Sequence, residues 1–415
     1  MSRRLGVLYV TYDGLLEPLG QSQVVKYVER LARHARVTVL SYEKPRDIAD
    51  RVTVRVLAAR LDAAGVEWVR LRYHKRPMLP ATAWDVVRGI ALAYRVVRAR
   101  RVAIVHARGY VASVVAVAVK RLTGVRFLFD MRGFWADEKV DGGHWSGHSL
   151  PYRLAKRWER TFFERADAIV SLTEAGVNAF PSLGYRLAPH TSVEVIPTCA
   201  DLDAFTPGPR DPVLVEQLGL AGRFVIGYVG TLSHWYLRAE TLRYLAVLAR
   251  ARPDSRVLFV SHENHAALRR DAVAAGIPAE MIVTTAAAFA DMPAHVRLMD
   301  LTVFFIKPCF SKLGSAATKL AEFLATGIPV VINDGIGDSG RIVRDGRVGV
   351  VLAEAAPRMF EASLPEVDRL LADVETPRRC VATARRRFDL ADGVARYAAL
   401  YGRLASAVAS GVTVG

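Results

Sequence analysis

Short apolar runs rich in β-branched residues alternate along the chain with longer stretches whose apolar positions recur at helical spacing. The runs predict strands. In the first half they span 5–11, 37–42, 66–71, 102–107, 126–131, 168–173 and 193–198, and in the second half 224–231, 256–261, 281–286, 301–306, 329–334 and 348–352. Most of the runs are continuously apolar, which is typical of parallel strands buried on both faces. The pattern therefore predicts an α/β protein.

The chain is too long for one hydrophobic core, which suggests two domains. The segment DLDAFTPGPRDP (201–212) is rich in Pro, Gly and Asp and predicts a linker. We expect two Rossmann-like, doubly wound domains, 1–200 and 213–390, that face each other across a cleft. Ligands of such sheets bind at the carboxyl ends of the strands.

Composition indicates a globular protein of a reducing compartment. Cys199, Cys309 and Cys380 are few and far apart, and they offer no metal-ligand spacing. The first apolar run is too short for a signal peptide, and the run at 110–119 is half a membrane span. We expect a soluble, cytoplasmic protein.

Charge is unevenly distributed. Residues 1–200 carry 32 Lys and Arg against 18 Asp and Glu, a net charge of +14, whereas residues 201–415 carry 25 against 23, a net charge of +2. A genome-wide arginine bias would load both halves alike. Basic and apolar residues alternate in 70–84, and arginines continue along the next helix: Arg70, Arg72, Tyr73, Lys75, Arg76, Met78, Leu79, Trp84, Arg88, Arg95 and Arg98. This mixture predicts peripheral binding to an anionic membrane, at its inner face, through the first half.

The stretch NDGIGDSGRIV (333–343) contains the G-x-G-x-x-G spacing of a dinucleotide site at Gly335, Gly337 and Gly340. It follows a predicted strand, but too few residues precede the strand at 348–352 for the usual crossover helix. We therefore do not expect a nicotinamide cofactor. Small residues at a strand end can still turn bare backbone N–H groups toward an anion.

The segment 307–338 combines a Ser/Gly/Lys loop, a short helix near 316–326 and a strand. On that helix Lys319 and Glu322 lie one turn apart on one face. The glutamate can accept hydrogen bonds from ribose hydroxyls, and the lysine can hold a diphosphate. The alternative is an ordinary surface salt bridge.

Several motifs together resemble the retaining glycosyltransferases of family 4, which have the GT-B fold, and more narrowly one bacterial branch of them. They are TKLAEFLATGIPVV (318–331), GIGD (335–338), YDGLLEPLGQSQVVKYVERLA (12–32), DMRGFWADEKVDGG (130–143) and GYVGTLSHWY (227–236). The resemblance implies a nucleotide-sugar donor held by the second domain, an acceptor held by the first, and no metal or other cofactor. It also implies that a last helix, about 391–409, packs back on the first domain.

On the donor side, Glu322 matches the second glutamate of the family's E-x7-E motif, which holds the ribose. Gly314 stands where the first glutamate is usual. The usual Arg and Lys after the first strand of the second domain have no clear match, and Lys312, Lys319 and Arg238 are the substitutes. Gly230, Gly314, Ser315, Gly335 and Gly337 complete the predicted donor site. Fixed cations and N–H groups there would stabilise the departing diphosphate.

On the acceptor side, Tyr12, Asp13, Gly14 and Gly20 follow the first strand, where the family has a glycine-rich loop. Asp130 and Arg132 lie where many relatives place a histidine that contacts the sugar, so with Lys312 and Lys319 they are the candidate catalytic residues. His106 and Arg108 end another strand. In the structural alternative, Asp130 pairs with Arg132 and His106 is a satisfied core residue.

We predict a nucleotide-sugar-dependent glycosyltransferase for a glycan, lipid-linked or envelope acceptor. Two other interpretations stay open. The missing first glutamate suggests a non-catalytic GT-B protein that binds a nucleotide-sugar or a partner, and the charge alone suggests a nucleic-acid-binding protein. Asp201 and Asp203 have the D-x-D spacing of metal-dependent sugar transferases, but they lie in the linker. Trp135 and Trp145 lie amid charges without a recognisable nucleic-acid-binding module.

Overall fold

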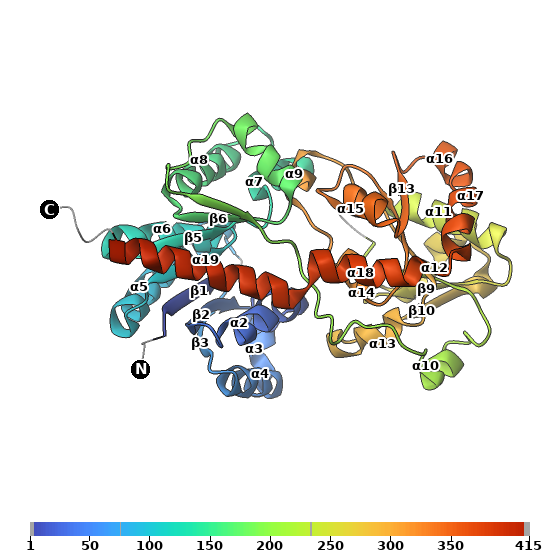
Figure 1. Ribbon diagram of the computed structural model, residues 1–415, viewed down its shortest axis with the longest axis horizontal. Coiled ribbons are helices and arrows are strands. Elements are labelled where there is room, and N and C mark those ends of the chain that lie inside the picture. Colours follow the sequence, from blue (N-terminus) through green and yellow to red (C-terminus); the bar gives the residue numbers. More distant parts are fainter. Residues whose placement is uncertain (1–3, 75, 233–234, 411–415) are drawn as a thin grey trace. The chain divides into compact units, whose positions relative to one another are not determined.

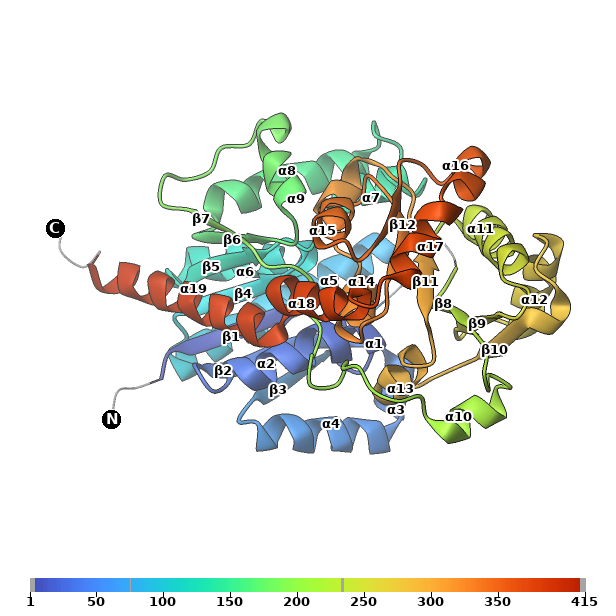
Figure 2. The same ribbon diagram turned by 45° about the vertical axis from the view of Figure 1, so that its right-hand side comes forward.

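The computed structural model describes residues 4–74, 76–232 and 235–410. The chain divides into two compact units: unit 1 is Met1–Pro197 with Leu390–Gly415, and unit 2 is Thr198–Asp389. Each contains one parallel sheet flanked by helices (Figures 1 and 2). The predicted α/β class with two Rossmann-like units is confirmed.

The sheet of unit 1 has seven parallel strands in the order β3-β2-β1-β4-β5-β6-β7. They are β1 (Gly6–Thr11), β2 (Arg36–Glu43), β3 (Glu67–Arg72), β4 (Ile104–Arg108), β5 (Arg126–Asp130), β6 (Ala168–Ser171) and β7 (Ser192–Val195). All seven predicted strands of this half are present. The direction of winding reverses between β1 and β4, and such a switch point is where open α/β sheets bind ligands.

The helices of unit 1 are α1 (Pro18–Gly20), the π-helical η1 (Gln21–Val25), α2 (Lys26–Leu31), α3 (Pro45–Ala49), α4 (Arg51–Ala63), α5 (Met78–Arg100), α6 (Tyr110–Thr123), α7 (Trp135–Asp141), α8 (Leu150–Arg165), α9 (Glu174–Asn178), the short η2 (Phe180–Leu183) and α19 (Leu390–Ser410). Although α19 is last in the chain, it packs against α2 and β4 (Figure 1). Its inner side buries Tyr397, Leu400, Tyr401 and Leu404.

The sheet of unit 2 has six parallel strands in the order β10-β9-β8-β11-β12-β13. They are β8 (Val225–Val229), β9 (Arg256–Val260), β10 (Ile282–Thr285), β11 (Leu301–Phe304), β12 (Val330–Asn333) and β13 (Gly349–Leu352). The six strands predicted here are also present. The switch point of this sheet lies between β8 and β11.

The helices of unit 2 are α10 (Pro212–Gln217), α11 (Arg238–Ala251), α12 (His265–Ala274), η3 (Ala279–Met281), η4 (Phe289–Asp291), α13 (Met292–Val296), η5 (Phe310–Gly314), α14 (Thr318–Ala325), α15 (Ser339–Gly346), α16 (Pro357–Ala362), α17 (Leu364–Ala372) and α18 (Thr376–Phe388). The described residues of the chain include no helix that is both long and apolar enough to span a bilayer.

Candidate functional site

Four segments of unit 2 meet at the carboxyl ends of β8, β11 and β12. They are the β8–α11 loop, the loop after β11 with η5, the first turns of α14, and the GIGD loop. The β8–α11 loop is fastened to the end of β11, because Lys307 N–H donates to the Trp235 carbonyl (2.8 Å) and Leu237 N–H to the Phe305 carbonyl (3.0 Å). These contacts hold the β8–α11 loop beside the carboxyl end of β11, at the switch point of the sheet.

Lys319 is buried rather than on the surface, so the surface salt bridge is the wrong interpretation for this pair. Its Nζ donates to the Val229 carbonyl (2.6 Å) and lies 3.9 Å from the ring centre of Tyr236 and 4.6 Å from that of Tyr228. Burial lowers the pKa of Lys319 to about 7, against an opposing effect of the nearby Glu322 carboxylate. An anion that reached Nζ would favour its charged form.

Gly230 follows β8 with a φ of +96°, which strains any residue with a side chain. A Cβ atom there would lie 3.4 Å from Lys319 Nζ. The bare backbone of Gly230 therefore keeps space beside the ammonium group, as expected for a residue that lets a ligand come close.

Lys312 is the second buried cation of this region. It belongs to η5, and its Nζ lies 3.7 Å from the ring centre of Trp235. Trp235 and Tyr236, adjacent in the β8–α11 loop, thus cover Lys312 and Lys319 respectively. The sequence analysis did not predict these contacts between lysines and aromatic rings. Two adjacent aromatic residues in the loop after the first strand of unit 2 could have indicated them.

Glu322 lies one turn after Lys319 on α14 and is partly exposed. Its charge acts on both Lys319 and Tyr236, where it adds to the effect of burial in raising the pKa of the Tyr236 hydroxyl. The lysine, the glutamate and Tyr236 therefore form one electrostatic cluster. Before α14 in the sequence, η5 ends at Gly314, and Ser315 follows it. Ser315 N–H donates to the Lys312 carbonyl (3.2 Å).

The expectation of bare amides in the GIGD loop is wrong for two of its glycines. Gly335 N–H donates to Asp334 Oδ1 (2.9 Å) and Gly337 N–H to the Lys312 carbonyl (2.8 Å). The loop is instead joined to η5 by the hydrogen bond from Gly337 to Lys312. A short crossover helix, α15, follows the loop and leads to β13.

Arg238 lies at the first position of α11, but its guanidinium is engaged within unit 2. It forms ion pairs with Glu263 (2.7 Å) and Asp271 (2.8 Å) and also donates to the Leu232 carbonyl. As a diphosphate ligand it would have to leave these partners, so Lys312 and Lys319 are the better placed cations.

In unit 1, a pocket of about 150 Å³ opens at the switch point between β1 and β4. Four predicted residues line it: Tyr12, Asp13, Arg108 and Arg132. Arg108 donates to the Asp13 carboxylate, while its buried Nε has no partner among the described residues. The pocket therefore joins guanidinium and carboxylate groups at strand ends.

The aromatic wall of this pocket includes Tyr110 and Trp135, and Glu138 adds a carboxylate. The Trp135 and Trp145 rings meet edge to face at 5.3 Å. In the sequence we considered both tryptophans only as possible nucleic-acid-binding residues, and we did not single out Glu138. The position of Trp135, shortly after the strand that ends at Asp130, could have indicated that it lies at the carboxyl edge of the sheet, where ligands bind.

Gly14 and Gly20 have a packing role. The loop after β1 folds over the buried Glu43 carboxylate, which accepts hydrogen bonds from Leu15 N–H (2.9 Å) and Leu16 N–H (3.3 Å). A Cβ on Gly14 would approach Glu43 Oε2 to 2.8 Å, and one on Gly20 would overlap the Gly14 carbonyl at 2.0 Å. Neither glycine lines the pocket.

Asp130 and His106 are buried beneath the pocket rather than in its lining. Asp130 lies 3.8 Å from Arg132 and 3.5 Å from His106 Nε2. Arg132 alone belongs to both this cluster and the pocket, and it has a left-handed φ of +58°.

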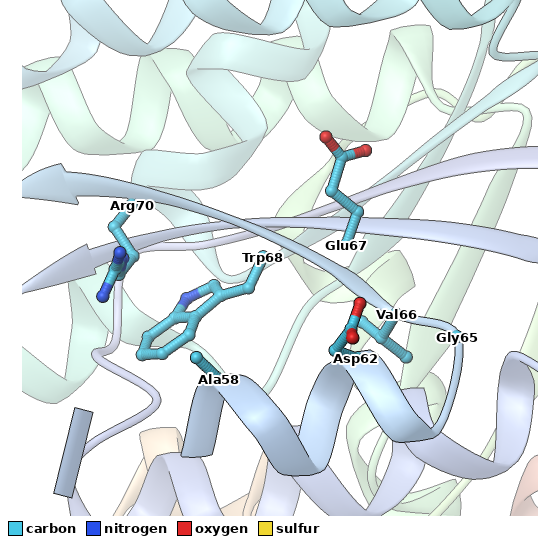
Figure 3. Close-up of a pocket in the computed structure, with 7 residues that line it drawn as sticks. All are labelled: Ala58, Asp62, Gly65, Val66, Glu67, Trp68 and Arg70. Atoms are coloured by element: carbon cyan, nitrogen blue, oxygen red, sulfur yellow. The ribbon is translucent and has the colours of Figure 1, made fainter. Parts of the chain in front are cut away.

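A larger hollow of unit 1, about 410 Å³, lies between the end of α4 and the edge strand β3. Figure 3 shows the Trp68 ring beside Arg70, whose guanidinium lies 4.8 Å from the ring centre, and Asp62 on α4. None of the predicted site residues lines it. Among the described residues, no group of three or more His, Cys, Asp or Glu could hold a metal ion.

Comparisons with known proteins show the family of the chain. Residues 20–199 match the model of the glycosyl transferase 4-like domain, and residues 223–373 match that of the glycosyl transferases group 1. The chain belongs to the family 4-like glycosyltransferases of the GT-B fold. The first match includes the residues that line the unit 1 pocket except Tyr12 and Asp13, and the second includes Lys312, Lys319 and Glu322.

A curated relative, D-inositol 3-phosphate glycosyltransferase of Gordonia bronchialis, is 27% identical over 237 residues. The match covers 54% of this family 4-like chain and only 50% of that protein.

Solved structures share the fold at low identity. HepE of Anabaena, in complex with UDP and glucose, is 17% identical with a TM-score of 0.69 over 96% of this chain and 99% of its own. Sucrose-phosphate synthase of Thermosynechococcus elongatus is 14% identical with a TM-score of 0.72 over 97% and 100%. A Listeria monocytogenes protein assigned as a UDP-N-acetylglucosamine 2-epimerase is 15% identical with a TM-score of 0.59 over 96% and 95%.

Proposed function

We propose that this protein transfers a sugar from a nucleotide-sugar donor to a glycan, lipid-linked or envelope acceptor, with retention and without a metal ion. The observation that carries the proposal is the cluster of Lys319, Glu322 and Tyr236, with Lys312 under the adjacent Trp235, beside the carboxyl ends of β8 and β11. Open α/β sheets bind ligands at such a switch point, and these residues offer two cations and one carboxylate to a ligand. The complexes of the Anabaena relative with UDP and with UDP-glucose support this donor class.

The proposed chemistry needs charge more than proton transfer. As the nucleoside diphosphate leaves, negative charge grows on its phosphate oxygens and the sugar becomes cationic. Lys312 and Lys319, held by Trp235 and Tyr236, would stabilise that charge with little rearrangement. Glu322 would accept hydrogen bonds from the ribose hydroxyls.

The unit 1 pocket is our candidate for the acceptor. Asp13, Arg108 and Arg132 offer planar groups that can donate to and accept from sugar hydroxyls, and Trp135 offers an aromatic face. A pocket of about 150 Å³ has room for one small polar ring or headgroup rather than a long chain.

A second candidate is a non-catalytic protein that binds a nucleotide-sugar. The observation that favours it is Gly314 in the place of the first motif glutamate. The fold does not decide between the two candidates, because folds host many activities. Thermal-shift and transfer assays on the same panel of nucleotide-sugars separate them, since a bound ligand raises the melting temperature whether or not it reacts.

We expect one donor of that panel to both raise the melting temperature and release its nucleoside diphosphate, at a rate unchanged by saturating EDTA. Stabilisation without release would instead indicate the binding protein. A rate abolished by EDTA and restored by manganese or magnesium would contradict metal independence and return attention to Asp201 and Asp203.

We also propose that unit 1 binds the inner face of an anionic membrane through α5. Seven exposed residues lie within an arc of about 120° on this helix: Trp84, Val87, Arg88, Ala91, Tyr94, Arg95 and Arg98. Trp84 and Val87 are more than half exposed, at 56% and 58%. Apolar and basic side chains therefore share one outer face, as in helices that lie in a membrane interface.

No carboxylate offsets these arginines on the helix itself. The only acidic residue of α5 is Asp85, which is buried and accepts hydrogen bonds from Tyr12 Oη (3.0 Å) and the His74 backbone N–H (3.0 Å). Arg72 and Arg76, just before α5, are also exposed, while Lys75 and the Met78 side chain lie outside the described residues. Exposed arginines are therefore found just before α5 as well as along it.

We expect flotation with anionic vesicles at low salt and release at high salt. Each cation near such a surface contributes about 1 kcal/mol, so Arg88→Glu, Arg95→Glu and Arg98→Glu, which together remove three cations and add three anions, should lower the partition coefficient by at least about 100-fold. The matched control changes three exposed arginines of unit 2, Arg250, Arg385 and Arg386, to Glu. Equal losses in the two triple variants, or no binding of the wild type at low salt, would refute docking through α5.

A further inference from the structure

A buried polar chain connects the C-terminal helix to the floor of the unit 1 pocket. Tyr401 Oη of α19 lies 2.7 Å from His106 Nδ1 on β4. His106 Nε2 lies 3.5 Å from Asp130 Oδ2, and Asp130 Oδ1 lies 3.8 Å from Arg132 Nη1. The first three of these residues are almost completely buried, and Arg132 reaches the pocket.

The charge states along this chain follow from its surroundings. Burial raises the pKa of Tyr401 well above its usual value and lowers that of His106, so both groups are neutral near pH 7. Burial alone would raise the pKa of Asp130, but Arg132, His106 and Arg108 outweigh it and leave the carboxylate ionised. Gln23 and the rings of Tyr9, Tyr27 and Tyr397 enclose the cluster.

These states determine which histidine nitrogen carries the proton. His106 Nε2 faces the ionised Asp130 carboxylate, which can only accept a hydrogen bond, so the proton of the neutral ring resides on Nε2. Nδ1 then accepts a hydrogen bond from the Tyr401 hydroxyl. His106 Nε2 and Asp130 Oδ1 have no hydrogen-bond partner among the described residues, so a small approach of the two side chains would pair Nε2–H with the carboxylate.

Arg132 is held in an uncommon conformation at the end of this chain. It comes two residues after Asp130, the last residue of β5, and its φ of +58° is in the left-handed region. A non-glycine residue there costs about 1 kcal/mol or more unless its surroundings hold it. Such outliers gather at functional sites, and Arg132 lines both the enclosed cluster and the pocket.

We propose that Tyr401, acting through His106 and Asp130, is a positioning residue that fixes the Arg132 guanidinium in the pocket of unit 1. The C-terminal helix is then part of the acceptor site although it follows that site by more than 250 residues. The importance of Arg132 for transfer rests on the proposed function. The arrangement of Tyr401, His106, Asp130 and Arg132 does not.

The first test is spectroscopic and needs no substrate. In protein labelled with ¹⁵N-histidine, the His106 signals, identified by their loss in His106→Gln, should show a neutral ring protonated at Nε2. Tyr401→Phe removes one oxygen; the proton should stay on Nε2, which faces Asp130, while the Nδ1 resonance moves to that of a lone-pair nitrogen without a hydrogen bond. An unchanged Nδ1 resonance in Tyr401→Phe, or a wild-type ring protonated at Nδ1, would overturn the proposal.

The second test is a double-mutant cycle on transfer with the donor and acceptor that support turnover. Tyr401→Phe should lower kcat/KM for the acceptor about 3- to 10-fold, as expected for one neutral hydrogen bond. In the Arg132→Ala background it should change nothing further. The matched control is Tyr244→Phe in unit 2, a buried tyrosine whose hydroxyl bonds Ser363 Oγ at 2.8 Å.

Equal losses from Tyr401→Phe in both backgrounds would mean that the tyrosine only stabilises the fold, and the positioning role would be refuted. If no donor supports turnover, the proposed function fails, and the histidine spectrum still decides whether the chain of contacts exists. Melting temperatures of all variants, measured alongside, separate loss of folding from loss of position.

Discussion

Glu322→Ala is expected to weaken binding of the nucleoside diphosphate about 10- to 150-fold and to cripple sugar transfer while the fold stays intact. The reason is the loss of a charge-assisted hydrogen bond to the ribose, which contributes about 1.5–3 kcal/mol. Glu322 is partly exposed on α14, so its removal leaves no cavity in the core. Titration calorimetry with the nucleoside diphosphate measures the change.

The matched control for this variant is Glu361→Ala, which removes an exposed glutamate from α16 of the same unit. It should bind the nucleoside diphosphate like the wild type. Wild-type affinity in Glu322→Ala would show that this carboxylate does not hold the donor. Because Glu322 supports the charged form of Lys319, its removal should also lower the pKa of that lysine further.

Lys319→Met is expected to slow transfer by about 100-fold or more, because one preorganised donor to a developing anion is lost. The apolar replacement fits beside the Tyr228, Tyr236 and Phe304 rings that surround Nζ. Single-turnover rates with saturating donor measure the effect on the chemical step. A rate within a few-fold of the wild type would remove Lys319 from the catalytic residues.

The same variant should change how stability depends on pH. Burial lowers the pKa of Lys319 from its usual value near 10.5 to about 7, so the unfolded chain holds more protons than the folded chain between these two values. Wild-type stability should therefore rise with pH in this window, by at most about 1.4 kcal/mol per pH unit from this group. Below pH 7 the lysine is charged in both states, and the full cost of burying it remains.

Denaturant unfolding at pH 6, 7, 8 and 9 tests this linkage. Lys319→Met should be more stable than the wild type at pH 6, and the difference should shrink as the pH rises above 7. Lys307→Met, which changes an exposed lysine near the end of β11, should keep the wild-type slope. A constant difference between Lys319→Met and the wild type across the series would show that Lys319 does not titrate in this range.

The strands were predictable because their signal is local. Each β-branched apolar run of the sequence overlaps a strand of the structure, with ends that differ by a few residues. Some predictions were too long at the carboxyl end: the strand predicted for 301–306 stops at Phe304, and Phe305 and Ile306 instead bond to the β8–α11 loop and to Asn333. An apolar residue can be buried without belonging to a β-strand.

The donor site was only partly predictable. The spacing of Lys319 and Glu322 predicted a functional helix face, but whether the lysine lies in water or among aromatic rings depends on Tyr228 and Tyr236, more than 80 residues earlier. For the GIGD loop, the sequence suggested a ligand contact where the structure has an internal one. Its glycines suggested free amides, and only the folded chain brings the Lys312 carbonyl to Gly337 N–H.

By itself, the sequence determined two α/β units, their strand positions and the family, because hydrophobic runs and motif spacing are properties of neighbouring residues. The tertiary structure decided which predicted residues act together. It buried Lys319, packed Gly14 against Glu43 and Gly20 against the Gly14 backbone, and joined Tyr401 to His106. Burial and hydrogen bonding depend on residues far apart in the chain, and so do the pKa values that follow from them.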